Sequence, residues 1–408
     1  MTNQNVVVVI CGALRLLISA TFPSLRSQLD NTVEFSTPFT SFKSLSEGVF
    51  LYDNGFPLYN GGVVHHSPLL IAFMSVIMKF RLDGLFYAVI DCIICWQLME
   101  IVKSNNATIL QLLQKKDHIL IGIIYALNPL LVLSNISGST VIFTHFAISS
   151  ALYFSSKGRY TTSTFFMALA SSLSIYSILL VIPFLALNVR SSEKAAGSKQ
   201  FKMLLRDNLQ SYLLFFSLLL LWSYKVSYQS FDFLSACYFQ YMTFAKSFPN
   251  IGLWWYFFIE MFSSFIPFFK GVFNLLLVCF ILPFTIRFNR LPIVAFVLSL
   301  GWIVLINPYP TLGAYGFLIS LVPLFDKIYG YMKYPVISFL LLMHAVILSP
   351  LFYHLWIDLG SGNSNFFFAL TFVYALGLSS ILSDLIWGSL RLEYDGRKQD
   401  FNKRVTQI

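Results

Sequence analysis

Residues 335–357 read PVISFLLLMHAVILSPLFYHLWI and contain no lysine, arginine, aspartate or glutamate. A helix needs about 20 predominantly apolar residues to cross the hydrocarbon core of a bilayer, so this stretch predicts a membrane-spanning helix. Residues 365–390 form a second long run, in which Asp384 is the one charged residue. Two such runs in succession indicate a polytopic membrane protein.

The composition of the whole chain leads to the same conclusion. Of its 408 residues, 57% are hydrophobic and 11% are charged, and the mean hydropathy is +0.72. In a soluble domain roughly a quarter of the residues are charged. This chain has less than half that fraction, which is too few charged residues to cover the surface of a water-soluble protein. The composition therefore excludes soluble globular, disordered, collagen-like and coiled-coil proteins. We expect an all-α polytopic membrane protein whose residues 1–408 form a single multi-spanning domain.

Thirteen apolar runs are long enough, or nearly long enough, to cross a bilayer. They are 5–22, 67–80, 84–102, 118–134, 139–155, 161–188, 209–226, 251–269, 271–286, 291–307, 311–325, 335–357 and 365–390. Because several are shorter than a full span, we expect about 10 to 13 transmembrane helices. The run 161–188 is long enough to tilt, or to break at Pro183. No basic segment precedes the first run and no A-x-A site follows it, so we expect an uncleaved first helix.

Lysine and arginine predict the orientation. The chain has 27 Lys and Arg against 18 Asp and Glu, a net charge of +9. The segments 190–207 and 391–408 are both basic, which is typical of cytoplasmic loops and tails. Such an excess favours anionic membrane lipids as partners. It does not indicate nucleic-acid binding, because no basic stripe lies on a soluble module.

The longest polar interval, residues 23–66, is expected on the opposite, luminal side. Within it Phe42, Leu45, Val49 and Tyr52 recur at helical spacing, which predicts an amphipathic helix lying along the membrane surface. His65 and His66 precede the proline that opens the next run, and we expect them to be hydrogen-bonding residues at a helix start.

The sequence predicts no catalytic residue, no cofactor and no metal site. Cys92 and Cys95 form a CxxC, but they lie inside an apolar run with no second pair, so we expect two buried small hydrophobic residues. There is also no P-loop lysine and no nucleophile elbow. Charges inside apolar runs must pair or reach water, so we expect Arg15 to pair with Asp91. Glu260, beside two tryptophans, is expected at the membrane interface.

Residues 47–59, followed by 65–70, resemble the first luminal loop of the multi-spanning GT-C glycosyltransferases. Those enzymes use lipid-phosphate sugars and carry acidic residues at the start of this loop, often as D-x-D or E-D. Here Asp30 and Glu34 stand four positions apart, so the scaffold is kept while the carboxylate pair is missing. An active GT-C-type transferase with a single base at Asp30 or Glu34 is the alternative function.

The segment 358–365, DLGSGNSN, separates the last two apolar runs and is followed by three phenylalanines. Glycines allow close approach of a ligand, and an asparagine amide can both donate and accept hydrogen bonds. The phenylalanines suit acyl chains, while a plain luminal turn is the other interpretation. The candidate lipid-binding residues are Asn363, Asn365, Ser361 and Phe366. The candidate supporting polar residues are His65, His66, Glu260 and Asp358.

Long strings of the chain resemble the PIG-U family of GPI transamidase subunits, and its fungal members in particular. The longest are PNIGLWWYFFIEMF at 249–262, GVVHHSPLL at 62–70 and GSGNSNFF at 360–367. The resemblance runs nearly end to end, and strings of this length and composition are rare.

The resemblance implies a non-catalytic subunit with a GT-C-like fold in the endoplasmic reticulum membrane. The complex attaches a preformed glycosylphosphatidylinositol (GPI) lipid to the C-terminus of precursor proteins. Its Cys–His catalytic centre is expected in PIG-K, and the further implied partners are PIG-T, PIG-S and the Gaa-type subunit. The family's lipid-site asparagine pair corresponds to Asn363 and Asn365. The sequons at Asn106 and Asn135 lie next to membrane runs, so we expect neither to carry a glycan.

Overall fold

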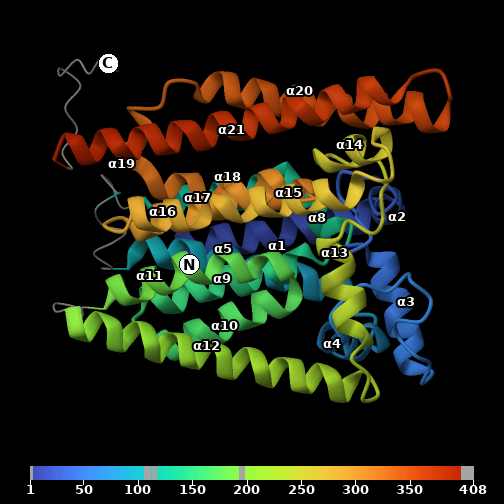
Figure 1. Cartoon of the computed structure of the whole chain (residues 1–408), viewed down its shortest axis with the longest axis horizontal. Helices are drawn as coiled ribbons and strands as arrows, with labels where there is room; N and C mark the ends of the chain where they lie inside the picture. Colours follow the sequence, from blue (N-terminus) through green and yellow to red (C-terminus); the bar gives the residue numbers. More distant parts are fainter. Residues whose placement is uncertain (1–2, 105–111, 113–116, 193–197, 397–408) are drawn as a thin grey trace.

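The computed structural model describes residues 3–104, 112, 117–192 and 198–396. Over these residues it contains helices and connecting segments and no strand, which confirms the all-α prediction. Most of the long helices run along one common direction and form a bundle (Figure 1).

The helices of the first half of the chain begin at the N-terminal region and end with the longest helix of that half. They are α1 Asn3–Thr21, α2 Leu25–Leu29, α3 Phe42–Asp53, α4 Pro68–Lys79, α5 Asp83–Lys103, α7 His118–Leu127, α8 Pro129–Ile136, α9 Val141–Ser156, α10 Tyr160–Leu173, the 3-10 turn η1 Ile175–Leu180, α11 Val181–Ser191 and α12 Ser198–Val226.

The second half of the chain begins with short helices and ends with a pair of long ones. They are the π-helix η2 Leu234–Phe239, α13 Gln240–Met242, α14 Trp254–Glu260, α15 Ile266–Cys279, α16 Ile281–Arg287, α17 Pro292–Ile306, α18 Leu312–Leu321, the 3-10 helix η3 Val322–Phe325, α19 Asp326–Tyr329, α20 Pro335–Tyr353, the π-helix η4 His354–Asp358 and α21 Ser364–Tyr394.

Seven helical segments of the described chain are long and apolar enough to cross a membrane, which supports a multi-pass protein. They are Asn3–Thr21, Asp83–Lys103, Lys199–Val226, Ile266–Arg287, Leu312–Tyr329, Pro335–Asp358 and Ser364–Tyr394. The pair α7 and α8, bent by 51°, would make an eighth span. Four shorter apolar helices remain, so the expected 10 to 13 spans stay a prediction.

The run 161–188 breaks, but at Ser174 and not at Pro183. Helix α10 ends at Leu173, and Ser174 has extended backbone with φ −144° and ψ 121°. The 3-10 turn η1 follows and leads into α11. Pro183 is the third residue of α11, where a backbone N–H has no intrahelical acceptor, so proline is tolerated there.

The prediction that 251–269 and 271–286 form two separate spans is wrong. Helix α14 has only seven residues, and Met261 after it is extended. A new helix starts at Ile266 with Pro267 in its first turn, where proline is compatible with a helix start but not with a helix interior. The span therefore runs from Ile266 to Arg287, and α14 is a separate short helix.

The two ends of the bundle differ in character. Helices α2, α3 and α14 and the connection between α20 and α21 lie at one end, on the right of Figure 1. The C-terminal ends of α11 and α21 and the start of α12 lie at the other. We call these the loop end and the basic end, and which side of the membrane each faces stays a prediction.

A buried charge pair joins the first helices. Arg15 of α1 is 1% exposed and bonds through Nε to a carboxylate oxygen of Asp91 on α5, which confirms the expected pair. The same carboxylate accepts the Tyr125 hydroxyl at 2.5 Å and the Asn135 amide nitrogen at 2.8 Å. The four groups come from α1, α5, α7 and α8, so one polar network fixes four helices to each other.

Candidate functional site

The connection between α20 and α21 is built by its glycines and by Asn363. Gly360 has φ +62°, a left-handed conformation that glycine adopts without strain. Asn363 has extended backbone, and its Oδ1 accepts from the backbone N–H of Asn365 at 3.0 Å and of Phe366 at 3.4 Å. Asn363 is therefore the N-cap of α21, a position that asparagine favours. The segment is a turn, and its asparagines are exposed at the loop end.

Asn365 is held from outside its own helix. Its side-chain oxygen accepts a hydrogen bond from the hydroxyl of Tyr256 on α14. The Tyr256 ring stacks on Phe368 with centroids 4.1 Å apart and planes 12° apart. The sequence did not predict this contact, because 253–258 resembles an interfacial aromatic belt and no local spacing joins it to a residue 109 positions later.

The other candidates around the turn have different roles. Ser361 closes the turn by donating from its hydroxyl to the Leu355 carbonyl at 3.2 Å. Asp358 lies 2.6 Å from a ring nitrogen of His354 and does not contact either asparagine through a hydrogen bond. Phe366 is 55% exposed and stacks on Phe352 at 5.9 Å. The turn thus combines exposed amides with an exposed apolar ring.

Beneath the turn lies a layer of packed aromatic side chains. Trp255 of α14 is fully buried, with ring centroids 5.8 Å from Trp356, 5.7 Å from Phe367 and 5.6 Å from Phe368. Glu260 ends the same short helix and is exposed one helical turn after Tyr256. It shares an element with Tyr256, but it is not hydrogen-bonded to the asparagines. Helix α14 is thus fastened to the start of α21 by its first turn.

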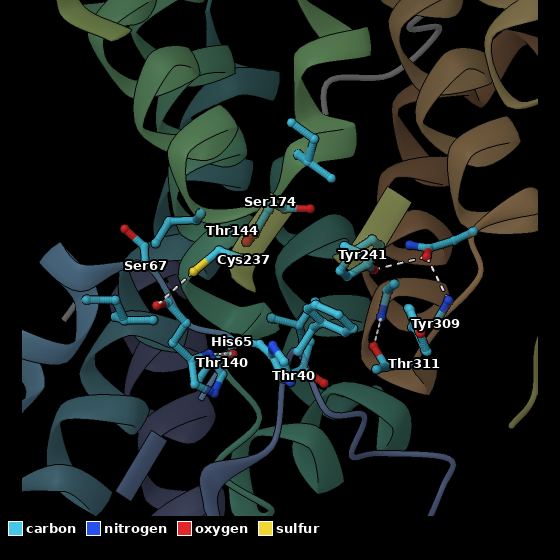
Figure 2. A pocket seen from close by; sticks show the side chains of 18 residues that line it. Thr40, His65, Ser67, Thr140, Thr144, Ser174, Cys237, Tyr241, Tyr309 and Thr311 are labelled. Carbon is cyan, nitrogen blue, oxygen red and sulfur yellow. Dashed lines mark hydrogen bonds between the residues drawn. The ribbon is translucent and has the colours of Figure 1, made fainter. Parts of the chain in front are cut away.

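His65 and His66 belong to a different place, a polar cavity of about 80 Å³. Figure 2 shows its lining, which contains hydroxyl, imidazole and aromatic groups and no charged side chain. His65 Nδ1 lies 2.8 Å from the Ala236 carbonyl, and His66 Nε2 lies 3.1 Å from the Ser41 carbonyl. Both are buried just before α4, which confirms their role as hydrogen-bonding residues at a helix start.

The environment of the two histidines disfavours their charged form. Burial lowers the pKa of His65, and burial lowers the pKa of His66 to about 4. A neutral imidazole can bond to carbonyls and hydroxyls without a counter-charge. No residue lines both this cavity and the turn of α20 and α21, so the structure does not unite the histidines with the asparagines.

The two acids of the first polar interval are both engaged inside the protein. Asp30 accepts from the backbone N–H groups of Phe42 at 3.0 Å and Lys43 at 2.9 Å, and so caps α3. Glu34 is 2% exposed and accepts from the Ser349 hydroxyl at 2.6 Å, and burial raises the pKa of its carboxyl. A general base must reach a substrate proton. Neither carboxylate is presented to a substrate, which does not favour the transferase alternative.

Both cysteines of the CxxC contact backbone carbonyl groups of neighbouring helices. Cys92 Sγ lies 3.4 Å from the Val8 carbonyl, and Cys95 Sγ lies 3.5 Å from the Gly122 carbonyl. Over the described residues, no three His, Cys, Asp or Glu side chains come together as a metal site would require.

Comparison with known proteins adds independent information. Residues 9–374 match the family model described as GPI transamidase subunit PIG-U. GPI transamidase component GAB1 of Saccharomyces cerevisiae is 49% identical over 98% of this chain and 97% of the relative. The GAB1 homolog of Schizosaccharomyces pombe is 32% identical over 92% of this chain and 91% of the relative. The human GPI-anchor transamidase component PIGU is 27% identical over 91% of this chain and 90% of the relative.

Proposed function

Since the chain belongs to the PIG-U family of GPI transamidase subunits, we propose that it binds the GPI lipid and presents it for attachment to precursor proteins. As a member of this family it is a multi-pass membrane subunit with a role in GPI-anchor attachment. The binding site in this proposal is the turn between α20 and α21, with Asn363 and Asn365 as its central residues.

The observation that carries the proposal is the pairing of two exposed amides with an apolar surface at one end of a long membrane helix. A GPI lipid has acyl chains and a polar glycan, so its site needs both kinds of surface. Phe366 and Leu359 are 55% and 60% exposed beside the asparagines. Apolar side chains of this kind can hold acyl chains by van der Waals contact, because lipid tails are as apolar as leucine.

The proposed mechanism is positioning. The chain holds the glycan so that its terminal ethanolamine amine meets the thioester formed on PIG-K, and the amine replaces water as the nucleophile. Orienting two reactants in this way converts a bimolecular step into an effectively unimolecular one. Bond-making is left to PIG-K, and PIG-T, PIG-S and the Gaa-type subunit complete the proposed assembly in the endoplasmic reticulum membrane.

The test is the double substitution Asn363→Ala and Asn365→Ala in the intact complex. We expect attachment of GPI to a reporter precursor to fall several-fold while the subunits still co-purify, because the substitutions remove the polar groups that orient the glycan. Asn54→Ala is the matched control, since Asn54 is another exposed asparagine at a helix end on the loop side. Unchanged attachment in the double variant removes the two residues from the site.

A second variant separates binding from capping. Asn363→Ala also removes the N-cap of α21, a loss of about 1 kcal/mol. Asn363→Asp keeps an acceptor oxygen for the cap and removes the amide donors. If attachment fell only because the cap was lost, the aspartate variant would restore it, and that result would contradict a lipid contact by this side chain.

A further inference from the structure

The hydrogen bonds at the start of α21 engage the side-chain oxygens of both asparagines, while among the described residues no partner bonds to either NH₂ group. The Asn363 oxygen is occupied by two backbone N–H groups of its own helix. The Asn365 oxygen is occupied by the Tyr256 hydroxyl. An asparagine carboxamide has one acceptor oxygen and one NH₂ group with two donors. Asn363 therefore has its NH₂ group to offer to a ligand, and Asn365 has two free donors beside the one lone pair that remains on its oxygen.

From this geometry we propose that Tyr256 is a positioning residue, which fixes the Asn365 carboxamide so that its donors face the ligand. The inference rests on the proposed function, because it concerns the same lipid site. It goes beyond that function by naming a residue on a different helix, and by naming the chemistry of the contact. The recognised group is an acceptor oxygen, and not an ammonium or another donor.

The position of Tyr256 is itself fixed. Its ring stacks on Phe368 at 4.1 Å, and the neighbouring Trp255 is buried against Trp356 and Phe367. A tyrosine side chain has two side-chain torsions, and stacking of this kind restrains both, so the hydroxyl points in one direction. Helix α14 thus sets the rotamer of a residue on α21. Without the hydroxyl, the Asn365 amide could rotate and present its oxygen to the ligand.

The acceptor oxygen has two sources in a glycolipid, a phosphodiester or a neutral hydroxyl or ether of the glycan. Asn365→Asp distinguishes them, because it replaces the donors with a negative charge. If the ligand oxygen belongs to a phosphate, repulsion lowers attachment below that of Asn365→Ala. If the oxygen is neutral, the two variants are equally impaired. Attachment retained by Asn365→Asp would mean that the ligand donates, and would overturn the inference.

The experiment on Tyr256 uses the full complex in membranes, with attachment measured over a range of GPI concentrations. Tyr256→Phe keeps the stacked ring and removes the hydroxyl. One hydrogen bond contributes ~0.5–1.5 kcal/mol, so we expect the KM for GPI to rise roughly 2- to 12-fold with kcat little changed. In a background of Asn365→Ala, Tyr256→Phe should have no further effect, because the group that it positions is gone.

The control is Tyr228→Phe, because the Tyr228 hydroxyl also makes one bond, to the Tyr52 carbonyl at 3.1 Å. It should leave the KM for GPI unchanged. If Tyr256→Phe raises KM by the same factor with and without Asn365, the tyrosine acts independently and the inference fails. If Asn365→Ala impairs attachment and Tyr256→Phe does not, the inference fails while the proposed function stands. If Asn365→Ala has no effect, the proposed function fails first.

Discussion

Asp91 shows how much one residue can carry when it is buried in a membrane bundle. Its carboxylate bonds to Arg15, Tyr125 and Asn135, and Arg15 has almost no exposed surface. Removing one partner of a buried pair leaves the other charge uncompensated in a medium of low dielectric. The structural importance of this residue therefore exceeds that of any exposed charge pair.

We expect Asp91→Asn to destabilise the protein by about 3–5 kcal/mol. Asp83→Asn is the matched control, since it makes the same chemical change in the pair that Asp83 forms with Arg26, where the side chains are 21% and 28% exposed. That substitution should cost about 1 kcal/mol or less. Thermal unfolding of the purified complex in detergent measures both. Equal midpoints for the two variants would contradict a structural role for the buried pair.

The sequence could predict the pairing of Arg15 with Asp91 but not the hydrogen bonds that Tyr125 and Asn135 add to it. A charge inside an apolar run demands a partner, and that requirement alone joins Arg15 to Asp91. Tyr125 and Asn135 have no charge that would mark them as partners, and they lie on α7 and α8, two helices bent by 51° at Asn128. Such a bend is a property of tertiary packing.

The predicted extent of helix α3 was close to the observed Phe42–Asp53. Apolar spacing predicted the helix, and Ser41 caps it by accepting from the Ser44 N–H at 3.3 Å. The second cap could not be predicted, because Asp30 lies twelve residues before Phe42 and reaches the helix only after the chain has folded back.

We expect Asp30→Ala to destabilise the first polar interval by about 0.5–2 kcal/mol, because two backbone N–H groups lose their acceptor. Asp30→Asn, which keeps one acceptor oxygen, should lie between the wild type and the alanine variant. Protease sensitivity at the loop end measures the change.

Analysis of lipid intermediates should find complete GPI accumulating in cells, and an under-glycosylated intermediate would instead indicate sugar transfer by this chain.

The described residues form a helical bundle whose two ends are built from different elements (Figure 1). The loop end holds the turn of α20 and α21, and the basic end holds the C-terminal ends of α11 and α21 and the start of α12 (Figure 1). The charge pattern of the sequence predicts that these ends face opposite sides of the membrane. The proposed site could be predicted only in part: the turn of α20 and α21 is local in sequence, whereas Tyr256 comes from a helix that the sequence did not separate from α15.

The separation of the ends predicts the result of cysteine labelling in sealed microsomes. Gly61 lies in an exposed turn where an added Cβ meets no atom within 4 Å beyond its chain neighbours, and Lys202 is exposed near the start of α12, so we expect Gly61→Cys and Lys202→Cys both to be accessible. A membrane-impermeant maleimide added outside should label position 202 and reach position 61 only after the membrane is opened. The wild-type chain, with its five native cysteines, supplies the background. Labelling of both positions from one side would contradict the proposed orientation.

The burial of Asn135 also bears on quality control during biosynthesis. Its amide nitrogen, the atom that an oligosaccharide would modify, is already committed to Asp91 and to the Tyr87 carbonyl at 2.9 Å, and the residue is 5% exposed. Once α8 has docked, the modifying enzyme has no access to this atom. A sugar attached there would therefore mark a polypeptide that lingered before its helices assembled, and would prevent that copy from ever completing its core.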